Sequence, residues 1–473
     1  MRRSAPALLC ASLAAALVSP APAQRVAPPP APAVEARVAA LRDAALADTT
    51  AYDIVEGLTT EVGPRPGGSE AEARARAWAL AKLTALGFKN VRIETTMKRT
   101  WARGVETASV ISPFPQPLRV TALGGSGATP AGGITADIVY FASFADLQRA
   151  PDGSLAGKIA FVSNAMVQTQ DGSSYGAFGP ARFVGPNIAA KKGALAIVIR
   201  SIGSDHGRGP HTGQTNFEPG VTPIPAGALS TSDADNLARM VARGKPVRLH
   251  LTLTPRDLGM TETGNVIAEV PGTDPGAGIV LIGGHLDSWD LGTGAIDDGA
   301  GVAITAAAAK RLLDGPAPRR TIRVVWFGDE ETGGAGSQAY FAAHKGERHA
   351  LVAESDFGAD RVWRVAFRLP PSAAPVSDRV AAALAPLGVV RSREAAGGGA
   401  DIAPLVRAGV PVIDLNQDGT RYFDYHHTPE DTLDRIDPVQ LRQNVAAWTA
   451  MLAIVANAPE DIGAKDIGNV GAQ

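Results

Sequence analysis

The sequence predicts an α/β protein in which a mostly parallel, mixed sheet carries helices on both faces. First, residues 279–284 and 322–327 are continuous apolar runs, which is typical of strands buried on both faces. Second, an Ala-rich helical segment at residues 301–313 separates them, and strands that alternate with helices favour a parallel sheet. Third, polar clusters follow these strands directly, at the sheet edge where such folds bind ligands.

The other elements of this predicted domain follow from local patterns. Ser69 and Glu72 form a capping box that begins a helix, which runs to about Leu86 and ends at Gly87. We expect further helices at residues 34–47, 337–343 and 438–456, and further strands at residues 265–270, 362–367 and 411–415. These segments continue the alternation of strand and helix toward the end of the chain.

Residues 124–254 have a different pattern of expected strands and helices and contain none of the polar clusters described below. Strands are expected at residues 134–141, 158–162 and 195–200, and short helices at 187–193 and 232–243. Because the earlier pattern resumes after this segment, we expect it to be an inserted domain. The predicted division is a catalytic domain at residues 24–123 and 255–460, the insertion at 124–254 and a tail at 461–473.

Composition limits the partners and the location of the chain. It has 473 residues and a formal net charge of −2, which gives no reason to expect a nucleic-acid partner. Arg2 and Arg3, the apolar run at residues 5–18 and the small residues around Ala23 predict a signal peptide at residues 1–23. The apolar run is shorter than the roughly 20 residues of a membrane span, so we expect a secreted or periplasmic protein without a membrane anchor.

Five polar clusters carry the chemistry that the sequence predicts. They are His285-Leu286-Asp287, Asp297-Asp298-Gly299, Glu330-Glu331, Glu354-Ser355-Asp356 and His426-His427. Taken alone, each is more typical of a turn or a solvated surface. Together, around one sheet, they would bury more negative charge than a protein tolerates without compensation. Divalent cations supply that compensation, so we expect a metal site.

The ligand types indicate which metal and how many ions. The only cysteine lies in the predicted signal peptide, so the ligands must be nitrogen and oxygen atoms. Imidazole mixed with carboxylate favours zinc, with cobalt or manganese as alternatives. Two histidines and three carboxylates exceed the ligands of a single catalytic zinc, and one carboxylate can bridge two ions roughly 3.5–4 Å apart. Such a pair lowers the pKa of a bound water toward about 7, and a spare glutamate could take its proton.

These motifs resemble those of the co-catalytic two-zinc exopeptidases. The similarity covers Gly284–Asp290, Gly294–Gly299, Glu330–Gly334, Glu354–Asp356 and His426-His427, and in the insertion Pro210–Gly213. The resemblance implies that two Zn²⁺ ions per chain hold a hydroxide that attacks short peptides. It assigns His285 and Asp356 to one zinc, Glu331 and His427 to the other, and Asp297 to both. It further implies Glu330 as general base, Asp287 as the residue that orients His285, a protease-associated type of insertion, and a homodimer.

Three positions within this resemblance carry alternatives. His427 is preferred to its neighbour His426 because the segment that begins at Thr428 matches the family's His-Thr-x-x-Asp-Thr pattern. Asp329 precedes the glutamate pair, so any two of three consecutive acids could match the family's Glu-Glu pair. The Thr-Gly-Gly that follows aligns Glu330 and Glu331 with that pair. Asp401 matches a family loop near the pocket, but it could equally be the cap of the next helix.

Other functions on the same scaffold are a second set of alternatives. A non-catalytic, receptor-like relative would lose metal ligands, yet every ligand position here is filled. A one-zinc cyclase would need neither His285 nor Asp356. A hydrolase of non-peptide amides or N-acyl amino acids would use the same chemistry, and the motifs do not separate it from a peptidase.

Overall fold

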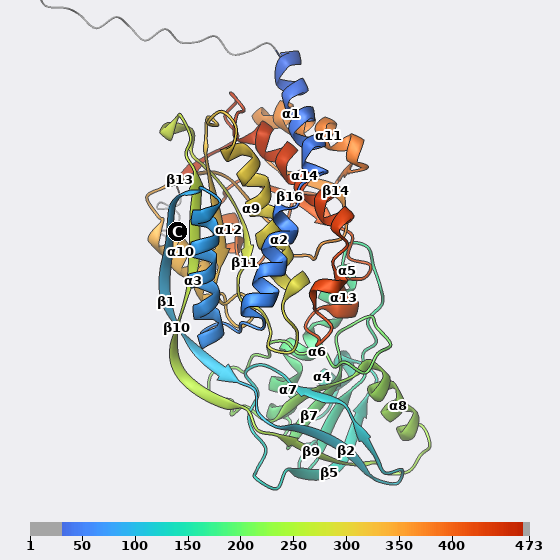
Figure 1. Cartoon of the computed structure of the whole chain (residues 1–473). Helices are drawn as coiled ribbons and strands as arrows, with labels where there is room; N and C mark the ends of the chain where they lie inside the picture. Colours follow the sequence, from blue (N-terminus) through green and yellow to red (C-terminus); the bar gives the residue numbers. More distant parts are fainter. Residues whose placement is uncertain (1–30, 467–473) are drawn as a thin grey trace, which may run out of the picture.

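The computed structural model describes residues 31–466 and has two sheets connected by two long strands (Figure 1). The predicted signal peptide at residues 1–23 lies outside the described residues. Within residues 31–466, every helix is too short or too polar to cross a membrane.

The larger sheet has the strand order β1-β10-β12-β11-β13-β16-β14-β15. Its strands are β1 (Lys89–Ala102), β10 (Arg256–Val270), β11 (Ile279–His285), β12 (Thr321–Phe327), β13 (Arg348–Glu354), β14 (Val362–Arg368), β15 (Val390–Arg391) and β16 (Val412–Gln417). The central strands β12, β11, β13 and β16 are parallel, whereas β1, β10 and β14 pair antiparallel at the flanks. The predicted α/β class with a mixed sheet is confirmed.

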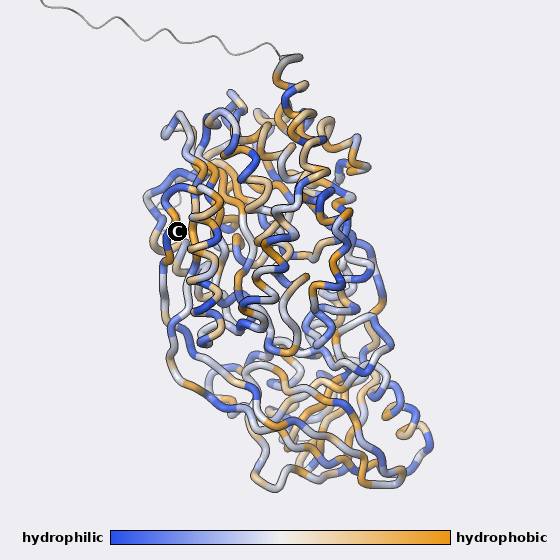
Figure 2. The backbone as a smooth tube through the Cα atoms, in the orientation of Figure 1, coloured by the Kyte–Doolittle hydropathy of each residue, from blue (hydrophilic) through white to orange (hydrophobic). Residues whose placement is uncertain are grey.

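Strand β12 shows why the central strands form. It is buried at every position after Thr321, and its residues other than Thr321 and Arg323 are apolar, because both of its faces are covered. Val324 and Trp326 point into the core on one face, while Val325 and Phe327 point into the core on the other. Figure 2 shows hydrophobic colour concentrated in these inner strands and the adjacent helices.

The helices cover the two faces unequally. One face carries α1 (Ala31–Ala45), α2 (Thr50–Gly57), α3 (Glu70–Ala85), α9 (Ala300–Leu313), α11 (Ala374–Leu384) and α14 (Pro438–Val455). The other carries α10 (Ala335–Ala343) and α12 (Ala403–Arg407). Helix α9 is buried almost all round, and its alanines let it pack closely between the sheet and α14 (Figure 1).

Helix α3 begins at the predicted capping residue. The Ser69 hydroxyl accepts a hydrogen bond from the Glu72 N–H at 3.1 Å. The Glu72 carboxylate accepts a hydrogen bond from the N–H of Gly68, the residue before the cap, at 3.0 Å. It also accepts one from the Thr263 hydroxyl of β10 at 2.8 Å. The cap therefore also fastens α3 to the larger sheet.

The second sheet has the order β3-β2-β9-β5-β6-β7-β8-β4. Its strands are β2 (Glu106–Ser112), β3 (Gln116–Leu118), β4 (Val120–Ala122), β5 (Ile134–Phe141), β6 (Ile159–Val162), β7 (Ala196–Arg200), β8 (Ala226–Leu229) and β9 (Arg248–Leu253). We call residues 106–253, which carry it, the inserted unit. The antiparallel ribbon of β1 and β10 enters and leaves this unit. Strands β2 to β4 precede residue 124, so we propose a boundary near residue 105 for the inserted domain.

Two features of the larger sheet differ from the expectation. Strand β13 was not predicted, because residues 348–354 begin with charged side chains and have only a short apolar run. The predicted tail is partly ordered within the sheet, since Lys465 and Asp466 form β17, which pairs with β13. Ile462 in the same segment is 1% exposed, so the tail begins as part of the core.

Candidate active site

Each polar cluster lies at the carboxyl end of a central strand of the larger sheet or in a loop beside it. His285 is the last residue of β11, Glu330 and Glu331 follow β12, and Asp356 follows β13. His426 and His427 lie beyond β16, after the short helix α13 (Tyr422–Tyr425). The parallel strands therefore bring these residues together at the edge where the sequence places them.

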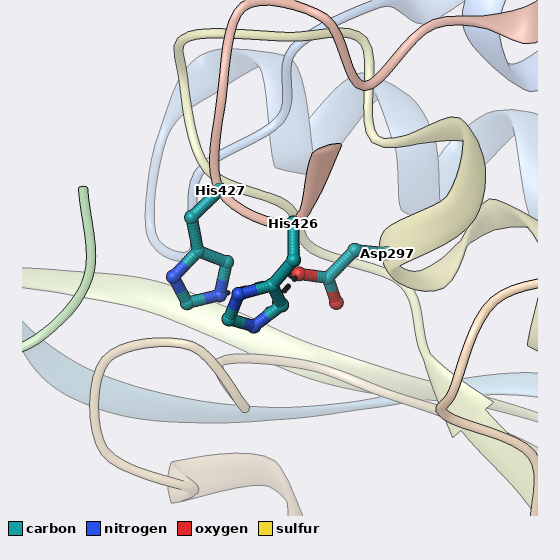
Figure 3. Close-up of side chains that lie close together, drawn as sticks. All are labelled: Asp297, His426 and His427. Carbon is teal, nitrogen blue, oxygen red and sulfur yellow. Dashed lines mark ion pairs between the residues drawn. The ribbon is translucent and has the colours of Figure 1, made fainter. Parts of the chain in front are cut away.

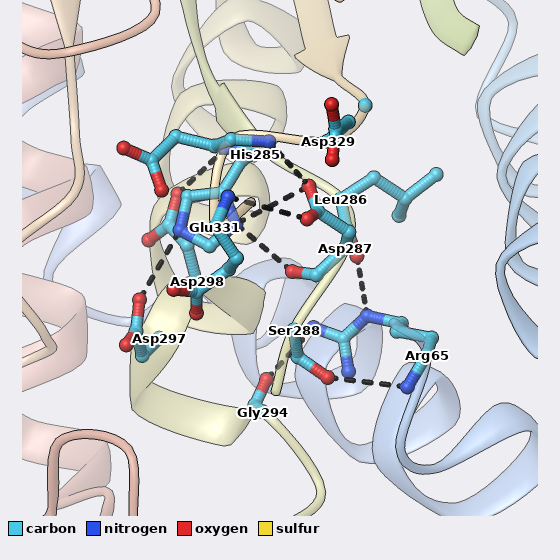
Figure 4. A network of polar contacts seen from close by, with 12 residues as sticks. Arg65, His285, Leu286, Asp287, Ser288, Gly294, Asp297, Asp298, Asp329 and Glu331 are labelled. Carbon is cyan, nitrogen blue, oxygen red and sulfur yellow. Dashed lines mark hydrogen bonds and ion pairs between the residues drawn. The ribbon is translucent and has the colours of Figure 1, made fainter. Parts of the chain in front are cut away.

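His285 is fully buried and held from three sides (Figure 4). Its Nδ1 donates a hydrogen bond to the backbone carbonyl of Asp287 at 2.9 Å, and its backbone N–H donates to Asp298 at 3.1 Å. Its Nε2 faces Asp297 Oδ1 at 3.1 Å and Asp356 Oδ1 at 3.6 Å. With a proton on Nδ1, the Nε2 lone pair is directed at the two carboxylates.

The carboxylate of Asp287 makes contacts that were not predicted from the sequence. It lies 3.7 Å from His285 Nδ1, whereas that nitrogen bonds the Asp287 main chain. The carboxylate accepts from the backbone N–H groups of Glu330 (3.0 Å) and Glu331 (3.4 Å). Asp287 thus orients His285 through its carbonyl and positions the glutamate pair through its side chain.

Asp297 lies between two histidines. Its Oδ1 faces His285 Nε2 at 3.1 Å, and its Oδ2 faces His427 Nε2 at 3.2 Å. The loop that carries it is fixed by Asp431, whose Oδ1 accepts from the N–H groups of Ala295 (2.8 Å) and Ile296 (2.7 Å). Burial and the charge of Asp297 raise the pKa of Asp431 to about 7. The shared carboxylate is therefore held by a residue far away in the sequence.

The three consecutive acids separate in the structure. Asp329 forms an ion pair with Lys98 of β1 and accepts from the Ala335 N–H at the start of α10. Glu330 and Glu331 line the cavity described below. The Glu331 carboxylate lies 2.9 Å from His427 Nε2, and burial together with Asp297 raises its pKa to about 7. Burial, the largest effect, likewise raises the pKa of Glu330 well above its usual value.

Two further acids lie behind Asp356. Glu354, at the end of β13, accepts from the Ile402 N–H at 2.9 Å. Asp401 is 1% exposed, and neither of its oxygens has a hydrogen-bond partner. It forms no cap on α12, so the capping alternative is wrong. Burial and the neighbouring Glu354 raise the pKa of Asp401 well above its usual value.

The two adjacent histidines differ in what their rings meet (Figure 3). Their ring planes stack, with centroids 3.5 Å apart. His427 Nε2 faces both Glu331 and Asp297, as given above, whereas His426 Nε2 reaches only Asp297, at 3.6 Å. His427 Nδ1 donates to the carbonyl of Thr212 at 3.2 Å, while His426 Nδ1 has no partner. His427 therefore presents an oriented Nε2 to two carboxylates.

The inserted unit supports these histidines through hydrogen bonds from His211 and Thr212. The Thr212 N–H donates to the His427 carbonyl at 3.0 Å, so Thr212 and His427 form a reciprocal pair. His211 Nδ1 donates to the His426 carbonyl at 2.8 Å, and its Nε2 meets Asp205 at 2.7 Å. His211 thus fixes the position of His426, and Thr212 fixes that of His427.

Two arginines fasten the loops around the site. Arg65 is fully buried and donates to the carbonyls of Leu286, Thr293 and Gly294, at 2.7 Å and 2.8 Å for the last two (Figure 4). Arg103, where β1 passes to β2, forms two hydrogen bonds with Asp290 at 2.7 and 2.8 Å. Sequence reasoning missed both residues, because an arginine that bonds loop carbonyls leaves no pattern of spacing.

A cavity of about 530 Å³ opens onto these groups. The larger sheet contributes Asp297, Glu330, Glu331, Asp356 and His427 to its lining, together with aromatic rings of residues 357, 422 and 423. The inserted unit contributes Tyr175, Arg182, Phe183, Gln214 and Asn216 to the same lining. Clefts between two units are common ligand sites, and this one combines aromatic rings with a dense set of charged and polar side chains.

The donor set fits divalent cations. Asp297 Oδ2, Glu331 Oε1 and Asp356 Oδ1 are buried atoms without a hydrogen-bond donor. Two groupings have the spacing of metal ligands, one of His285, Asp297 and Asp356, the other of Asp297, His426 and His427. Unpaired buried carboxylate oxygens are costly unless a cation meets them. Cations at these two groupings would meet Asp297 Oδ2 and Asp356 Oδ1, and the Glu331 carboxylate lies beside the second grouping, 2.9 Å from His427 Nε2.

The chain is similar to known peptidases. A model of peptidase family M28 matches residues 265–452. Carboxypeptidase Q of Bos taurus is 35% identical over 418 residues, which cover 88% of this chain and 87% of that protein. These matches include the whole set of clusters in the larger sheet.

Solved structures extend the similarity to three dimensions. A peptidase M28 precursor from Shewanella amazonensis has a TM-score of 0.89 and 49% identity, covering 91% of this chain and 98% of that one. A zinc aminopeptidase from Bacillus subtilis shares the fold, with a TM-score of 0.61, 20% identity and coverage of 88% and 97%. The chain therefore belongs to peptidase family M28 and is a metallopeptidase that hydrolyses peptide bonds.

Proposed function

We propose that the protein is a two-zinc exopeptidase that acts on short peptides. The observation that carries the proposal is Asp297, whose two oxygens each face the Nε2 of a different histidine, at 3.1 and 3.2 Å. A carboxylate placed in this way is suited to bridge two cations. In this assignment His285 and Asp356 complete one site, and Glu331 and His427 complete the other.

The choice of zinc rests on the ligand chemistry. Two imidazoles and three carboxylates suit zinc, and the similar fold from Bacillus subtilis is that of a zinc aminopeptidase. Two zinc ions bound here would polarise the scissile carbonyl and lower the pKa of a bound water toward about 7. The backbone contacts of His285 and His427 leave each Nε2 free to act as a ligand.

Side chains of the protein carry out the proton transfers and hold the site in place. Glu330 faces the cavity, and its main chain is fixed by Asp287, so its carboxylate can take the proton of the attacking water. The same carboxylate then delivers that proton to the nitrogen of the departing amine. Asp287 fixes the position of Glu330, and Asp297 holds the two halves of the site together. The wall from the inserted unit excludes water and limits the length of the substrate.

The exopeptidase class is supported by the cavity and by relatives. Residues of the inserted unit line the same cavity as Glu330 and Glu331, and a volume of about 530 Å³ favours a peptide end over a long chain. Carboxypeptidase Q, the relative from Bos taurus, bears a name of this class. The export of the chain and the homodimer stay predictions.

The test uses the chain without the predicted signal peptide and a panel of dipeptides and end-blocked peptides. Hydrolysis is measured before a chelator is added, in its presence, and after zinc is restored. We expect hydrolysis that chelation abolishes and zinc restores. Glu330→Gln should keep its zinc and lose about 10²–10⁴-fold in kcat, because the proton acceptor is gone. Glu218→Gln, at an exposed carboxylate of the inserted unit, is the matched control and should be as active as the natural chain.

Three outcomes would contradict the proposal. Hydrolysis that survives complete metal removal would exclude the metal mechanism. A Glu330→Gln variant with substantial turnover would exclude Glu330 as the base. Zinc-loaded protein that cleaves none of the dipeptides and end-blocked peptides in the panel would exclude short peptides as its substrates.

A further inference from the structure

Lys98 is a buried cation close to the loop of the proposed base, and the mechanism above does not use it. It lies in β1, and its side chain is 5% exposed, whereas its neighbours Met97 and Arg99 are exposed. Thr100 is the other buried residue of this strand, so the buried positions of β1 are both polar. Lysine is almost never fully buried unless its ammonium group is paired. The burial of Lys98 therefore requires a partner of opposite charge.

The partner is Asp329, the residue that precedes Glu330 in the chain. Its side chain is 2% exposed, and among residues 31–466 no second Lys, Arg or His lies within 4.0 Å of its carboxylate. The ammonium group of Lys98 also donates to the Thr332 hydroxyl, which in turn donates to Asp329. One ammonium group therefore contacts side chains on both sides of the pair formed by Glu330 and Glu331.

Asp329 closes the turn that carries the proposed base. Its backbone carbonyl accepts from the Gly334 N–H at 2.5 Å, and its Oδ2 accepts from the Ala335 N–H at 3.2 Å. Its φ is +62°, in the left-handed region that a residue with a side chain rarely adopts. Such a backbone conformation costs free energy and persists where contacts on several sides enforce it. The ion pair with Lys98 is one of these contacts.

Two glycines before α3 leave the space in which this ion pair forms. A Cβ added at Gly67 would lie 3.0 Å from Asp329 Oδ1, and one added at Gly68 would lie 3.3 Å from Lys98 Cδ. Gly68 also has a φ of +78°, which favours glycine. Side chains at these two positions would press on both members of the pair. The loop before α3 is therefore shaped to let Lys98 reach Asp329.

The glutamate pair is held from two directions. Asp287 accepts from the N–H groups of Glu330 at 3.0 Å and of Glu331 at 3.4 Å. Lys98 contacts the two residues that flank this pair, as described above. Lys98 does not line the cavity, so any effect that it has on the reaction passes through the turn.

We propose that Lys98 positions the general base: its ion pair with Asp329 holds the turn of residues 329–335 in the shape that directs the Glu330 carboxylate at the attacking water. Without the pair, the backbone of Asp329 loses a contact that enforces its conformation, and the turn relaxes. A displacement of about 1 Å at a reacting group slows a reaction by about 100-fold. The inference rests on the proposed role of Glu330 as the base.

The test uses the zinc-loaded chain and the dipeptide of the panel that it cleaves fastest. Lys98→Met keeps an unbranched side chain and removes the charge. We expect kcat to fall about 10- to 100-fold, while KM stays within about threefold and bound zinc is unchanged, because only the base is displaced. Lys98→Met leaves a buried carboxylate unpaired, so Lys98→Met/Asp329→Asn is the second variant. It contains no unpaired charge, carries the test if the single variant does not fold, and should show the same fall in kcat.

A double-mutant cycle with Glu330→Gln separates positioning of the base from a general loss of structure. If Lys98 acts through Glu330, adding Lys98→Met should change the residual kcat of Glu330→Gln by less than about threefold. A substitution that merely loosens the fold would lower kcat equally in both backgrounds.

Lys192 of the inserted unit is the matched control. Its side chain is 9% exposed, and its ammonium group donates to the Ala150 carbonyl, away from the cavity. Lys192→Met therefore removes a buried lysine charge of similar exposure. We expect its kcat to be that of the natural chain.

Three results would overturn the inference while leaving the peptidase function intact. The first is a folded Lys98→Met variant as active as the natural chain, and the second is a Lys98→Met/Asp329→Asn variant with full activity. The third is an equal loss in the natural and Glu330→Gln backgrounds. If Glu330→Gln itself keeps substantial turnover, the proposed base is wrong, and the inference fails with it.

Discussion

The two halves of the proposed metal site are built in different ways. The strand-end half, His285 and Asp356, is fixed within the larger sheet: Ser355 N–H donates to the Gly283 carbonyl at 2.9 Å, and Gln417 bonds the Ser355 hydroxyl at 2.9 Å. The loop half, Glu331 and His427, depends on the inserted unit, because Thr212 both donates to and accepts from His427. The sheet alone therefore positions one half, whereas the other also requires the insertion to be docked.

This difference assigns a second role to the inserted unit. It forms a wall of the cavity, and its Thr212 carbonyl also orients His427, a proposed metal ligand, by accepting a hydrogen bond from Nδ1. Groups that bond the far nitrogen of a metal-binding histidine fix its tautomer and its ring orientation. The predictions below separate the two halves, from the largest expected effect to the smallest.

The largest effect should come from the carboxylate that the halves share. Asp297→Asn removes its negative charge while keeping its size. We expect bound zinc to fall from about two ions per chain to about zero, and hydrolysis to be lost, because both sites lose a ligand. Elemental analysis of the purified, folded variant measures this. A variant that keeps both ions would exclude Asp297 as the bridge.

The next effect should be confined to one half. His427→Ala should lose about one ion per chain, and His285→Ala should lose the other, because each removes a single ligand. His426→Ala is the matched neighbour and should keep both ions. If His426→Ala loses zinc and His427→Ala does not, His426 is the ligand of the loop half.

A smaller effect should follow from loosening the insertion. His211→Ala removes the donor to the His426 carbonyl and leaves every proposed ligand in place. We expect the affinity of the loop half for zinc to fall about 10- to 100-fold, with that of the strand-end half unchanged. Titration with a competing chelator resolves the two ions. Equal weakening of both would mean that the halves are not held independently.

The smallest effect should come from the matched change in the strand-end half. Ser355→Ala removes the hydrogen bond from Gln417. We expect a decrease of about 1 kcal/mol in the free energy of unfolding, and no change in the affinity of the loop half. Urea unfolding and the same chelator titration measure the two quantities. A weaker loop half in this variant would contradict the separation.

What could be predicted from the sequence follows the same division. Strands β11 and β12 are continuous apolar runs, so their carboxyl ends, and with them His285 and Glu331, could be placed in advance. The predicted helix near residue 301 begins at Ala300, and the last predicted helix at Pro438. Periodicity identifies such elements because burial on both faces or along one stripe leaves a regular pattern.

The contacts that hold the loop half could not be predicted in this way. Thr212 bonds His427 through main-chain atoms, which any residue could supply, across a separation of 215 residues. Arg65 likewise bonds backbone carbonyls, which leaves no motif in the sequence. The position of Asp287 was foreseen, but not that its carboxylate meets the glutamate main chain, because spacing alone does not show which atoms meet.

The most direct test of the account is a crystal structure of the zinc-loaded Glu330→Gln variant with anomalous diffraction data at the zinc edge. The account predicts two anomalous peaks about 3.5–4 Å apart on either side of Asp297, one against His285 and Asp356 and the other against Glu331 and His427. A single peak, or two peaks that do not share Asp297, would contradict it.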